Sequence, residues 1–194
     1  EDEATGQVAE HLGQVTQAAM QLRSIIDEMI SLQRIDTGQA QISLTTFSVA
    51  NAISEAIRDI QLLAENKQHT VQLELPETEI EINTDQEILR LILASLLSNA
   101  VKFTPDHGTI TVSVAQDHDE LTISVADTGI GIAPEQLERI FDRFYQVEDS
   151  LRRRHGGLGL GLSIAQEMAE LIDGTITVES TVGVGSQFNL ILSL

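Results

Sequence analysis

Glycine is distributed unevenly along this chain of 194 residues. Nine of its thirteen glycines lie between Gly129 and Gly185, and six of these nine form two tight clusters, at 129–131 and 156–161. Because glycine has no Cβ, it can adopt a positive φ and lets another group approach the main-chain N–H groups closely. The last third of the chain must therefore fold around tight turns, which either serve the fold alone or cradle a phosphate-bearing ligand.

The apolar pattern predicts which elements these turns connect. Apolar residues at helical spacing predict helices over about 47–67, 84–103 and 160–172, and Pro134, in the favoured first-turn position, predicts another helix over 134–141. Alternating residues predict strands over 71–75, 80–82, 110–114, 121–125, 175–179 and 187–192. Thr84 and Glu87 form a capping box that would begin the second helix. Strands in hairpins and helices in separate groups predict an α+β sandwich with helices on one face of the sheet.

Residues 1–37 carry a different pattern. Seven apolar residues step alternately by four and three, which is a heptad seam: Val8, Leu12, Val15, Ala19, Leu22, Ile26 and Met29. One helix cannot bury such a seam alone, so we expect it to pack in a coiled coil or a helical bundle. An amphipathic helix lying on the chain's own domain is the alternative, and in either case Gly38 marks the end of the helix.

The composition excludes several classes of function. With 30 acidic and 11 basic residues the net charge is -19, which opposes binding to nucleic acid and to anionic membrane surfaces. The absence of cysteine excludes a disulfide scaffold and a thiol nucleophile, and it is compatible with a reducing cytoplasm. The longest apolar stretch, 88–97, is too short to span a bilayer, and we find no signal peptide. Because the chain begins with Glu1 rather than Met, we expect it to be part of a longer protein.

Two of the glycine-containing segments adjoin regular elements in a way that suits a ligand. Asp127 ends a predicted strand directly before Gly129 and Gly131, and its carboxylate could accept a hydrogen bond from an amino group such as adenine N6. A solvent-exposed Asp that opens a turn is the alternative. The segment 157–161 lies directly before a predicted helix, whose exposed N–H groups and positive dipole end favour an anion. A structural turn before a packed helix explains that segment equally well.

Charged and polar residues supply two further candidate groups. Ser95, Asn99 and Lys102 share one face of the predicted helix 84–103, where an Asn oxygen suits Mg²⁺ and a Lys ammonium suits phosphate. A polar stripe that faces water is the alternative. Five of the eleven basic residues lie within sixteen positions: Arg139, Arg143, Arg152, Arg153 and Arg154. This basic loop would neutralise a polyanion that the rest of the surface repels, or it would dock an acidic partner.

The four features occur in an order that resembles the ATP-binding domain of sensor histidine kinases. Residues 97–104 resemble its N box, 127–132 its G1 box, 141–144 its F box, 157–162 its G2 box and 183–188 the end of the domain. Upstream, the heptad helix followed by 32–38 resembles the second helix of the family's dimerisation and phosphotransfer domain.

The resemblance implies a fold and a division of the chain. The fold would be a two-layer α/β sandwich of the histidine kinase, gyrase and chaperone ATPase type, with helices on one face of a mixed sheet, preceded by a long heptad helix. Residues 1–37 would be helix 2 of the dimerisation hairpin, 38–46 a linker and 47–194 the ATP-binding catalytic domain. The helical bundle would make the parent protein a homodimer, and its partner would be a response regulator.

ATP and Mg²⁺ are the cofactors that the resemblance implies. Asn99 would help to hold Mg²⁺ on the triphosphate and is the one implied metal ligand, while Lys102 would contact phosphate. Phe103 would lie against the adenine, and Asp127 would accept from its N6 amino group. The other implied nucleotide-binding residues are Gly129, Gly131, Ile132, Tyr145, Arg152, Arg153, Arg154, Gly157, Leu158, Gly159, Leu160 and Gly161.

The resemblance implies that the segment from Arg139 to Arg154 is a lid over the nucleotide site. Three residues in or near the lid and the N box depart from the family's usual pattern. Ser95 stands where many members carry a first Asn, Gln146 where an Arg often contacts phosphate, and Leu158 in place of a common Thr. Arg152 to Arg154 would supply the missing positive charge. Phe141 and Phe144 would anchor the lid to the domain.

The implied reaction is in-line transfer of the γ-phosphoryl group of ATP to a His nitrogen, for relay to an Asp of the response regulator. In this family the acceptor His lies on the first dimerisation helix and precedes an acidic residue. His11 precedes Leu12, and of the other four His only His118 precedes an acidic residue, Asp119, in a predicted turn between two strands rather than on a dimerisation helix. We therefore expect the chain to bind Mg-ATP without phosphorylating itself. An ATPase or serine kinase of the same superfamily, or a degenerate nucleotide-responsive interaction domain, is the alternative.

Overall fold

The structure is a computed structural model that describes residues 26, 42–146 and 158–194. The long heptad helix predicted within 1–37 therefore lies outside the described residues, apart from the single residue Ile26. Arg152, Arg153, Arg154 and Gly157 also lie outside them.

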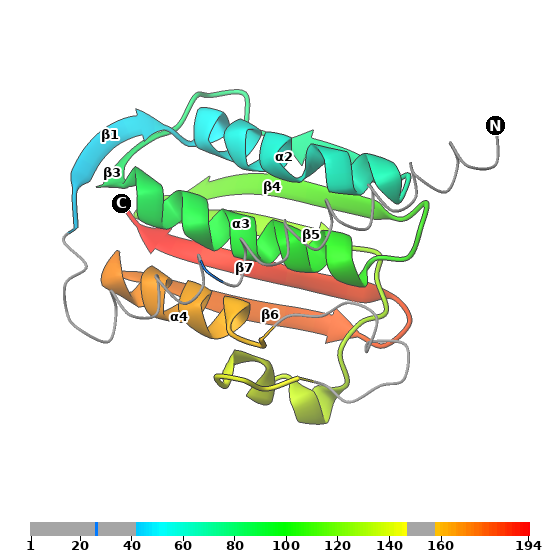
Figure 1. Cartoon of the computed structure of the whole chain (residues 1–194). Helices are drawn as coiled ribbons and strands as arrows, with labels where there is room; N and C mark the ends of the chain where they lie inside the picture. Colours follow the sequence, from blue (N-terminus) through cyan, green and yellow to red (C-terminus); the bar gives the residue numbers. More distant parts are fainter. Residues whose placement is uncertain (1–25, 27–41, 147–157) are drawn as a thin grey trace.

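A five-stranded mixed sheet forms one layer of the fold (Figure 1). Its strand order is β2 (Thr70–Glu74), β4 (Thr109–Asp117), β5 (Glu120–Asp127), β7 (Gly185–Ser193) and β6 (Gly174–Thr181). The β2–β4 pair is parallel and the other three pairs are antiparallel. The predicted alternation is confirmed in β4, where Ile110 and Val112 are fully buried and Thr111 between them is half-buried.

Three helices form the second layer, on one face of the sheet (Figure 1). They are α2 (Val49–Asn66), α3 (Gln86–Phe103) and α4 (Gly161–Leu171). The predicted helices at 47–67, 84–103 and 160–172 therefore exist within about two residues of their expected bounds. The predicted α+β sandwich with helices on one sheet face is confirmed.

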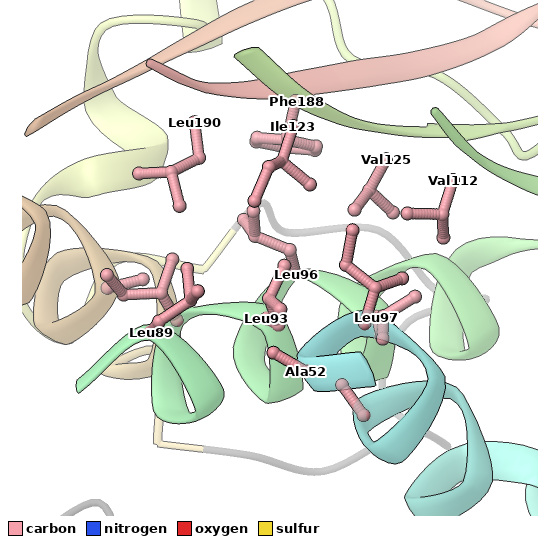
Figure 2. Packing of buried hydrophobic residues seen from close by; sticks show 14 of the residues in the cluster. Ala52, Leu89, Leu93, Leu96, Leu97, Val112, Ile123, Val125, Phe188 and Leu190 are labelled. Atoms are coloured by element: carbon pink, nitrogen blue, oxygen red, sulfur yellow. The ribbon is translucent and has the colours of Figure 1, made fainter. Parts of the chain in front are cut away.

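The core lies between α3 and the sheet. Leu93, Leu96 and Leu97 of α3 are all 0% exposed. Figure 2 shows them between the helix layer and side chains of the central strands, among which are Ile123 and Phe188. Burying each such leucine stabilises the fold by roughly 1.5–3 kcal/mol, so α3 is held by its packing more than by its intrinsic helix propensity.

A second, two-stranded sheet was not expected. Strand β1 (Leu44–Ser48) pairs antiparallel with β3 (Glu81–Asp85), so the segment expected to be a linker at 38–46 contributes its last residues to a strand. The first three residues of β1 are exposed, with Leu44 62% exposed, and a strand without a buried face leaves no alternation to read.

Two local predictions were wrong. Thr84 does not cap α3, because it belongs to β3 and pairs with Thr45, and the cap is Asp85 instead. The segment 134–141 is not one helix but two 3₁₀ turns, η1 (Pro134–Gln136) and η2 (Arg139–Phe141). Neither turn contains a fully buried residue, and Ile140 and Phe141 are only partly buried against the core, so the segment buries too little apolar surface to hold a longer helix.

None of the helices in the described ranges combines the length and the hydropathy that crossing a membrane requires.

Candidate functional site

The candidate site forms where the end of β5, the last turn of α3 and the first turn of α4 meet. Asp127 is the last residue of β5, as predicted, and it lies opposite Ile110 of β4 and Ser186 of β7. The loop that follows β5 returns to α3, because the Ile130 N–H donates to the Phe103 carbonyl at 3.3 Å. Residues far apart in the sequence thereby share one end of the sandwich.

Asp127 is half-buried, which argues against the alternative of an exposed turn residue. Burial raises the pKa of its carboxyl group, and hydrogen bonds from the Gly129 and Ser186 N–H groups lower it in part. The Gly129 N–H donates to Asp127 Oδ1 at 2.7 Å. A carboxylate oxygen can accept more than one hydrogen bond, so Asp127 retains the capacity to accept from a ligand amino group.

Gly129 and Gly131 are required by close approaches within the protein. A Cβ at Gly129 would lie 2.7 Å from the Phe103 carbonyl oxygen. Gly131 has φ +68, and a Cβ there would collide with the Thr181 carbonyl group. Thr181 belongs to β6 of the β6–β7 hairpin. Ile132 also contacts this hairpin, since its N–H donates to Ser180 Oγ at 2.8 Å. The loop 127–132 is thus held rigidly between α3 and the β6–β7 hairpin.

The last turns of α3 carry the predicted metal and phosphate ligands. Asn99, Lys102 and Phe103 are all half-buried, and Lys102 Nζ lies 4.9 Å from the centroid of the Phe103 ring. One turn earlier, the Ser95 hydroxyl oxygen is buried without a hydrogen-bond partner among the described residues. A Cβ at Gly161 would lie 3.1 Å from that oxygen, so Ser95 faces the first residue of α4.

A magnesium nucleotide fits these groups. The N-cap residue before α4, Leu160, provides no side-chain cap, so the N–H groups of the first turn suit an anion, and the Ser95 hydroxyl lies beside them. No cluster of three or more His, Asp or Glu side chains that could hold a metal occurs in 42–146 or 158–194. A Mg²⁺ ion near Asn99 would therefore take most of its ligands from phosphate oxygens and water, which is its usual behaviour.

The segment 139–145, which begins with η2 and starts the predicted lid, is tied to α4. Arg143 makes a bidentate ion pair with Glu167 of α4, with both N–O distances 2.8 Å. The Arg139 guanidinium lies over the Tyr145 ring at 4.2 Å. Phe141 packs against the core as predicted, but Phe144 is 64% exposed, so the expectation that its side chain anchors the lid is wrong. Its backbone does so instead, since the Phe144 N–H donates to the Gly159 carbonyl at 3.0 Å.

The described part of the second glycine cluster leads directly into α4. Gly159 has φ +71, and a Cβ there would lie 2.6 Å from the Tyr145 carbonyl oxygen. Leu158 is half-buried against the core, whereas Leu160 is 1% exposed. Any contact between Leu160 and a nucleotide would therefore involve its backbone rather than its side chain.

A pocket of about 240 Å³ lies elsewhere, between the first turn of α2, the loop 75–80 and Val114. Val114 pairs with Ile123, nearer the β4–β5 turn, whereas Asp127 lies at the opposite end of β5. The pocket shares no residue with the candidate site.

The chain's similarity to known proteins agrees with this geometry. Residues 84–194 match the family model described as histidine kinase-, DNA gyrase B- and HSP90-like ATPase, which is more than half of the chain. The chain belongs to this ATPase family. More specifically, it contains the ATP-binding catalytic domain of a sensor histidine kinase, as the four motifs implied.

Relatives of this ATPase domain include named sensor kinases. The circadian input-output histidine kinase CikA of Synechococcus elongatus is 34% identical over 183 residues, which are 93% of this chain and 24% of CikA. The sensor-like histidine kinase SenX3 of Mycobacterium tuberculosis is 36% identical over 174 residues, which are 90% of this chain and 42% of SenX3. The chain thus spans less than half the length of either relative.

Solved structures show the same fold. Full-length ShkA in complex with AMPPNP superposes with a TM-score of 0.79 at 24% identity, covering 95% of this ATPase chain and 38% of ShkA. The catalytic domain of the histidine kinase ThkA superposes with a TM-score of 0.69 at 23% identity, covering 78% of this chain and 95% of that domain.

Proposed function

We propose that the chain is the phosphoryl-donor portion of a sensor histidine kinase, which binds Mg-ATP between α3, the 127–132 loop and the start of α4. Its γ-phosphoryl group would pass to a His on a separate dimerisation helix and then to an Asp of a response regulator. The observation that carries the proposal is the half-buried Asp127 carboxylate at the end of β5. The loop that follows it is hydrogen-bonded to the Phe103 carbonyl, next to Lys102 at the end of α3. The solved structure of ShkA, which has a similar fold, is a complex with AMPPNP, and this supports nucleotide binding by the chain.

Each residue has a role that follows from its chemistry. Asp127 accepts a hydrogen bond from the adenine amino group, and Phe103 lies against the base. Lys102, already within 4.9 Å of the Phe103 ring centroid, presents a positive charge to the phosphates. Asn99 contributes one oxygen ligand to Mg²⁺, which neutralises charge on the triphosphate when bound.

The remaining predicted contacts belong to the lid and to the glycine loops. We propose that Gly129, Gly131, Ile132 and Tyr145 shape the pocket, and that Gly157, Leu158, Gly159, Leu160 and Gly161 bring backbone N–H groups to the phosphates. Arg152, Arg153 and Arg154 would add positive charge, which matters in a chain of net charge -19. The protein's contribution to phosphoryl transfer is then mainly positioning and charge neutralisation.

The context of the domain is also part of the proposal. The chain would consist of a dimerisation helix at 1–37, a linker at 38–46 and a catalytic domain at 47–194. Strand β1 overlaps the end of this linker. The parent protein would be a homodimer with a cytoplasmic catalytic domain and a response regulator as its partner.

Calorimetric titration with ATP, with Mg²⁺ and then with EDTA, tests the binding step. We expect binding that is stronger with Mg²⁺ and weakened by Asp127→Asn. A chain that binds no nucleotide under either condition would overturn the proposal and favour a non-catalytic interaction domain.

A second assay separates a kinase from an ATPase. The chain is incubated with γ-labelled ATP, alone and together with a dimerisation hairpin that carries an acceptor His. We expect label on the hairpin and none on this chain. Multiple-turnover release of phosphate without labelled protein would instead identify an ATPase.

A further inference from the structure

Both lysines of the chain lie at the end of α3. The sequence contains only Lys67 and Lys102, and Lys102 belongs to the last turn of α3 itself. Lys67 follows the last residue of α2, and its side chain crosses to α3. The Lys67 ammonium group donates to the carbonyl oxygens of Val101, Lys102 and Thr104, at 2.8, 3.1 and 2.7 Å.

These are three of the four carbonyls that the C-terminus of α3 leaves without intrahelical partners. A Lys ammonium has three N–H donors, so all three can be used here. The positive charge also lies at the negative end of the helix dipole, where it is stabilising. His69 Nε2 contacts the Thr104 carbonyl at 3.2 Å, which ties the same turn to the start of β2.

The last turn of α3 contacts the loop of the candidate site directly. Phe103 is the last residue of α3, and its carbonyl accepts from the Ile130 N–H. The same carbonyl lies so close to the loop that a Cβ at Gly129 would come within 2.7 Å of it, so the last turn of α3 and the loop pack directly against each other. A displacement of the last turn of α3 would therefore move both Phe103 and the loop that carries Asp127.

We infer that Lys67 is a positioning residue for the nucleotide site: it holds the last turn of α3 so that Phe103 and the 127–132 loop keep their binding geometry. Lys67 does not touch the nucleotide in this arrangement. The inference rests on the proposed function, since it concerns the same nucleotide.

The test compares nucleotide affinity in four variants, each titrated with Mg-ATP and with ADP at a temperature where all are folded by circular dichroism. Lys67→Met removes the ammonium group, and Lys67→Arg restores donors and charge. Arg58→Met removes a cation from an exposed position of α2, the helix that Lys67 follows, and matches the change in net charge. Ile60→Val removes a buried methyl group from α2 and lowers stability without removing a hydrogen bond to α3.

We expect the Kd of Lys67→Met to rise about tenfold for ATP and for ADP alike, equivalent to about 1.4 kcal/mol, because the displaced loop and Phe103 face the base. Lys67→Arg should stay within about threefold of the unchanged chain, and the Kd values of Arg58→Met and Ile60→Val should not change.

Three results would overturn the inference. They are an unchanged Kd in Lys67→Met, an equal rise in Ile60→Val at similar loss of stability, or a rise for ATP without one for ADP, which would assign Lys67 a direct electrostatic effect on the γ-phosphate. If the unchanged chain binds neither nucleotide, the proposed function fails instead, so the two failures are distinguishable.

Discussion

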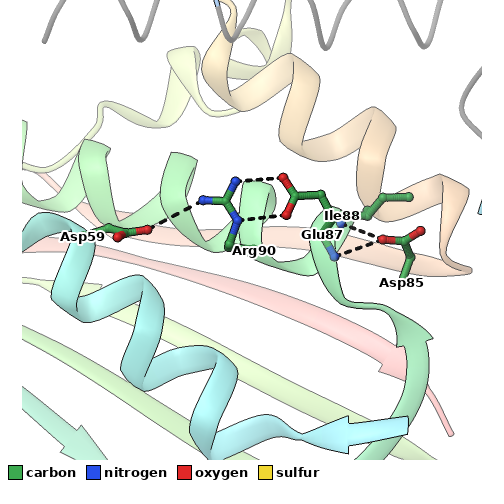
Figure 3. A network of polar contacts seen from close by, with 5 residues as sticks. All are labelled: Asp59, Asp85, Glu87, Ile88 and Arg90. Atoms are coloured by element: carbon green, nitrogen blue, oxygen red, sulfur yellow. Dashed lines mark hydrogen bonds and ion pairs between the residues drawn. The ribbon is translucent and has the colours of Figure 1, made fainter. Parts of the chain in front are cut away.

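The Asp85 side chain connects the start of α3 to Ser43, the residue before β1. Replacing Asp85 should show how much these hydrogen bonds contribute to the free energy of unfolding. Its Oδ1 accepts from the Glu87 and Ile88 N–H groups, both at 3.0 Å, and its Oδ2 accepts from the Ser43 N–H at 2.7 Å. Figure 3 shows the first two of these contacts. Because Asp85 is 6% exposed, water replaces the carboxylate poorly when it is removed.

The expected magnitudes follow from the two halves of this carboxylate. Loss of an N-cap costs about 1 kcal/mol, and loss of a hydrogen bond to a charged acceptor costs about 2 kcal/mol. Asp85→Ala removes both and should lower the free energy of unfolding by about 3 kcal/mol. Asp85→Asn retains an oxygen for the cap but turns its NH₂ group toward the Ser43 N–H, so it should lose about 2 kcal/mol.

Urea denaturation followed by circular dichroism measures these differences. For a domain of this size, about 3 kcal/mol corresponds to a fall in Tm of roughly 6–12 °C. Glu87→Gln is the control, since its exposed ion pair with Arg90 should contribute less than about 1 kcal/mol (Figure 3). An Asp85→Ala variant no less stable than this control would refute the reasoning, and an Asp85→Asn variant as stable as the unchanged chain would show that the Ser43 contact adds nothing.

Four further predictions concern the site. Asp127→Asn should weaken ATP binding by about ten- to a hundredfold in calorimetry, because a hydrogen bond to a charged acceptor is lost. The same change should raise stability at neutral pH. Since burial raises the pKa of the carboxyl group, the ionised form opposes folding, and that disadvantage should shrink as the pH falls through the folded-state pKa; equal stabilities from about pH 4 to about pH 8 would contradict this. Gly131→Ala should lower the free energy of unfolding in urea by more than about 1 kcal/mol, because of its φ of +68 and the clash with Thr181, and a neutral effect would show that the loop is free to adjust. Asn99→Ala should abolish most of the Mg²⁺ dependence of ATP affinity while leaving Mg²⁺-free ADP binding unchanged, and a retained dependence in titrations with and without EDTA would exclude Asn99 as a ligand.

The helices and paired strands could be predicted because burial repeats at a fixed period along the chain. α2 and α3 each present a buried stripe, and β4 and β5 alternate between buried and half-buried positions. Where that stripe is missing, the prediction failed. Most of β1 is exposed, and η1 and η2 contain no buried residue, so neither leaves a periodic signal.

The candidate site divides in the same way. Asp127 could be placed at a strand end, and Asn99 and Lys102 on one helical face, because these are properties of neighbouring residues in a regular element. The sequence could not predict that the side chain of Phe144 is exposed and that of Leu160 is buried, because both depend on which parts of the fold lie beside them.

The sequence by itself determined the family, the order of the elements and the residue types available for binding a nucleotide, since each is written in local spacing. Only the tertiary structure decided which contacts make those residues a site. Gly129 is required by the Phe103 carbonyl, Gly131 by Thr181, and the end of α3 is held by a lysine 34 to 37 positions earlier in the chain. The physical reason is that steric exclusion and hydrogen bonding act over a few ångströms in space, and separation along the sequence does not reveal which groups the fold brings that close.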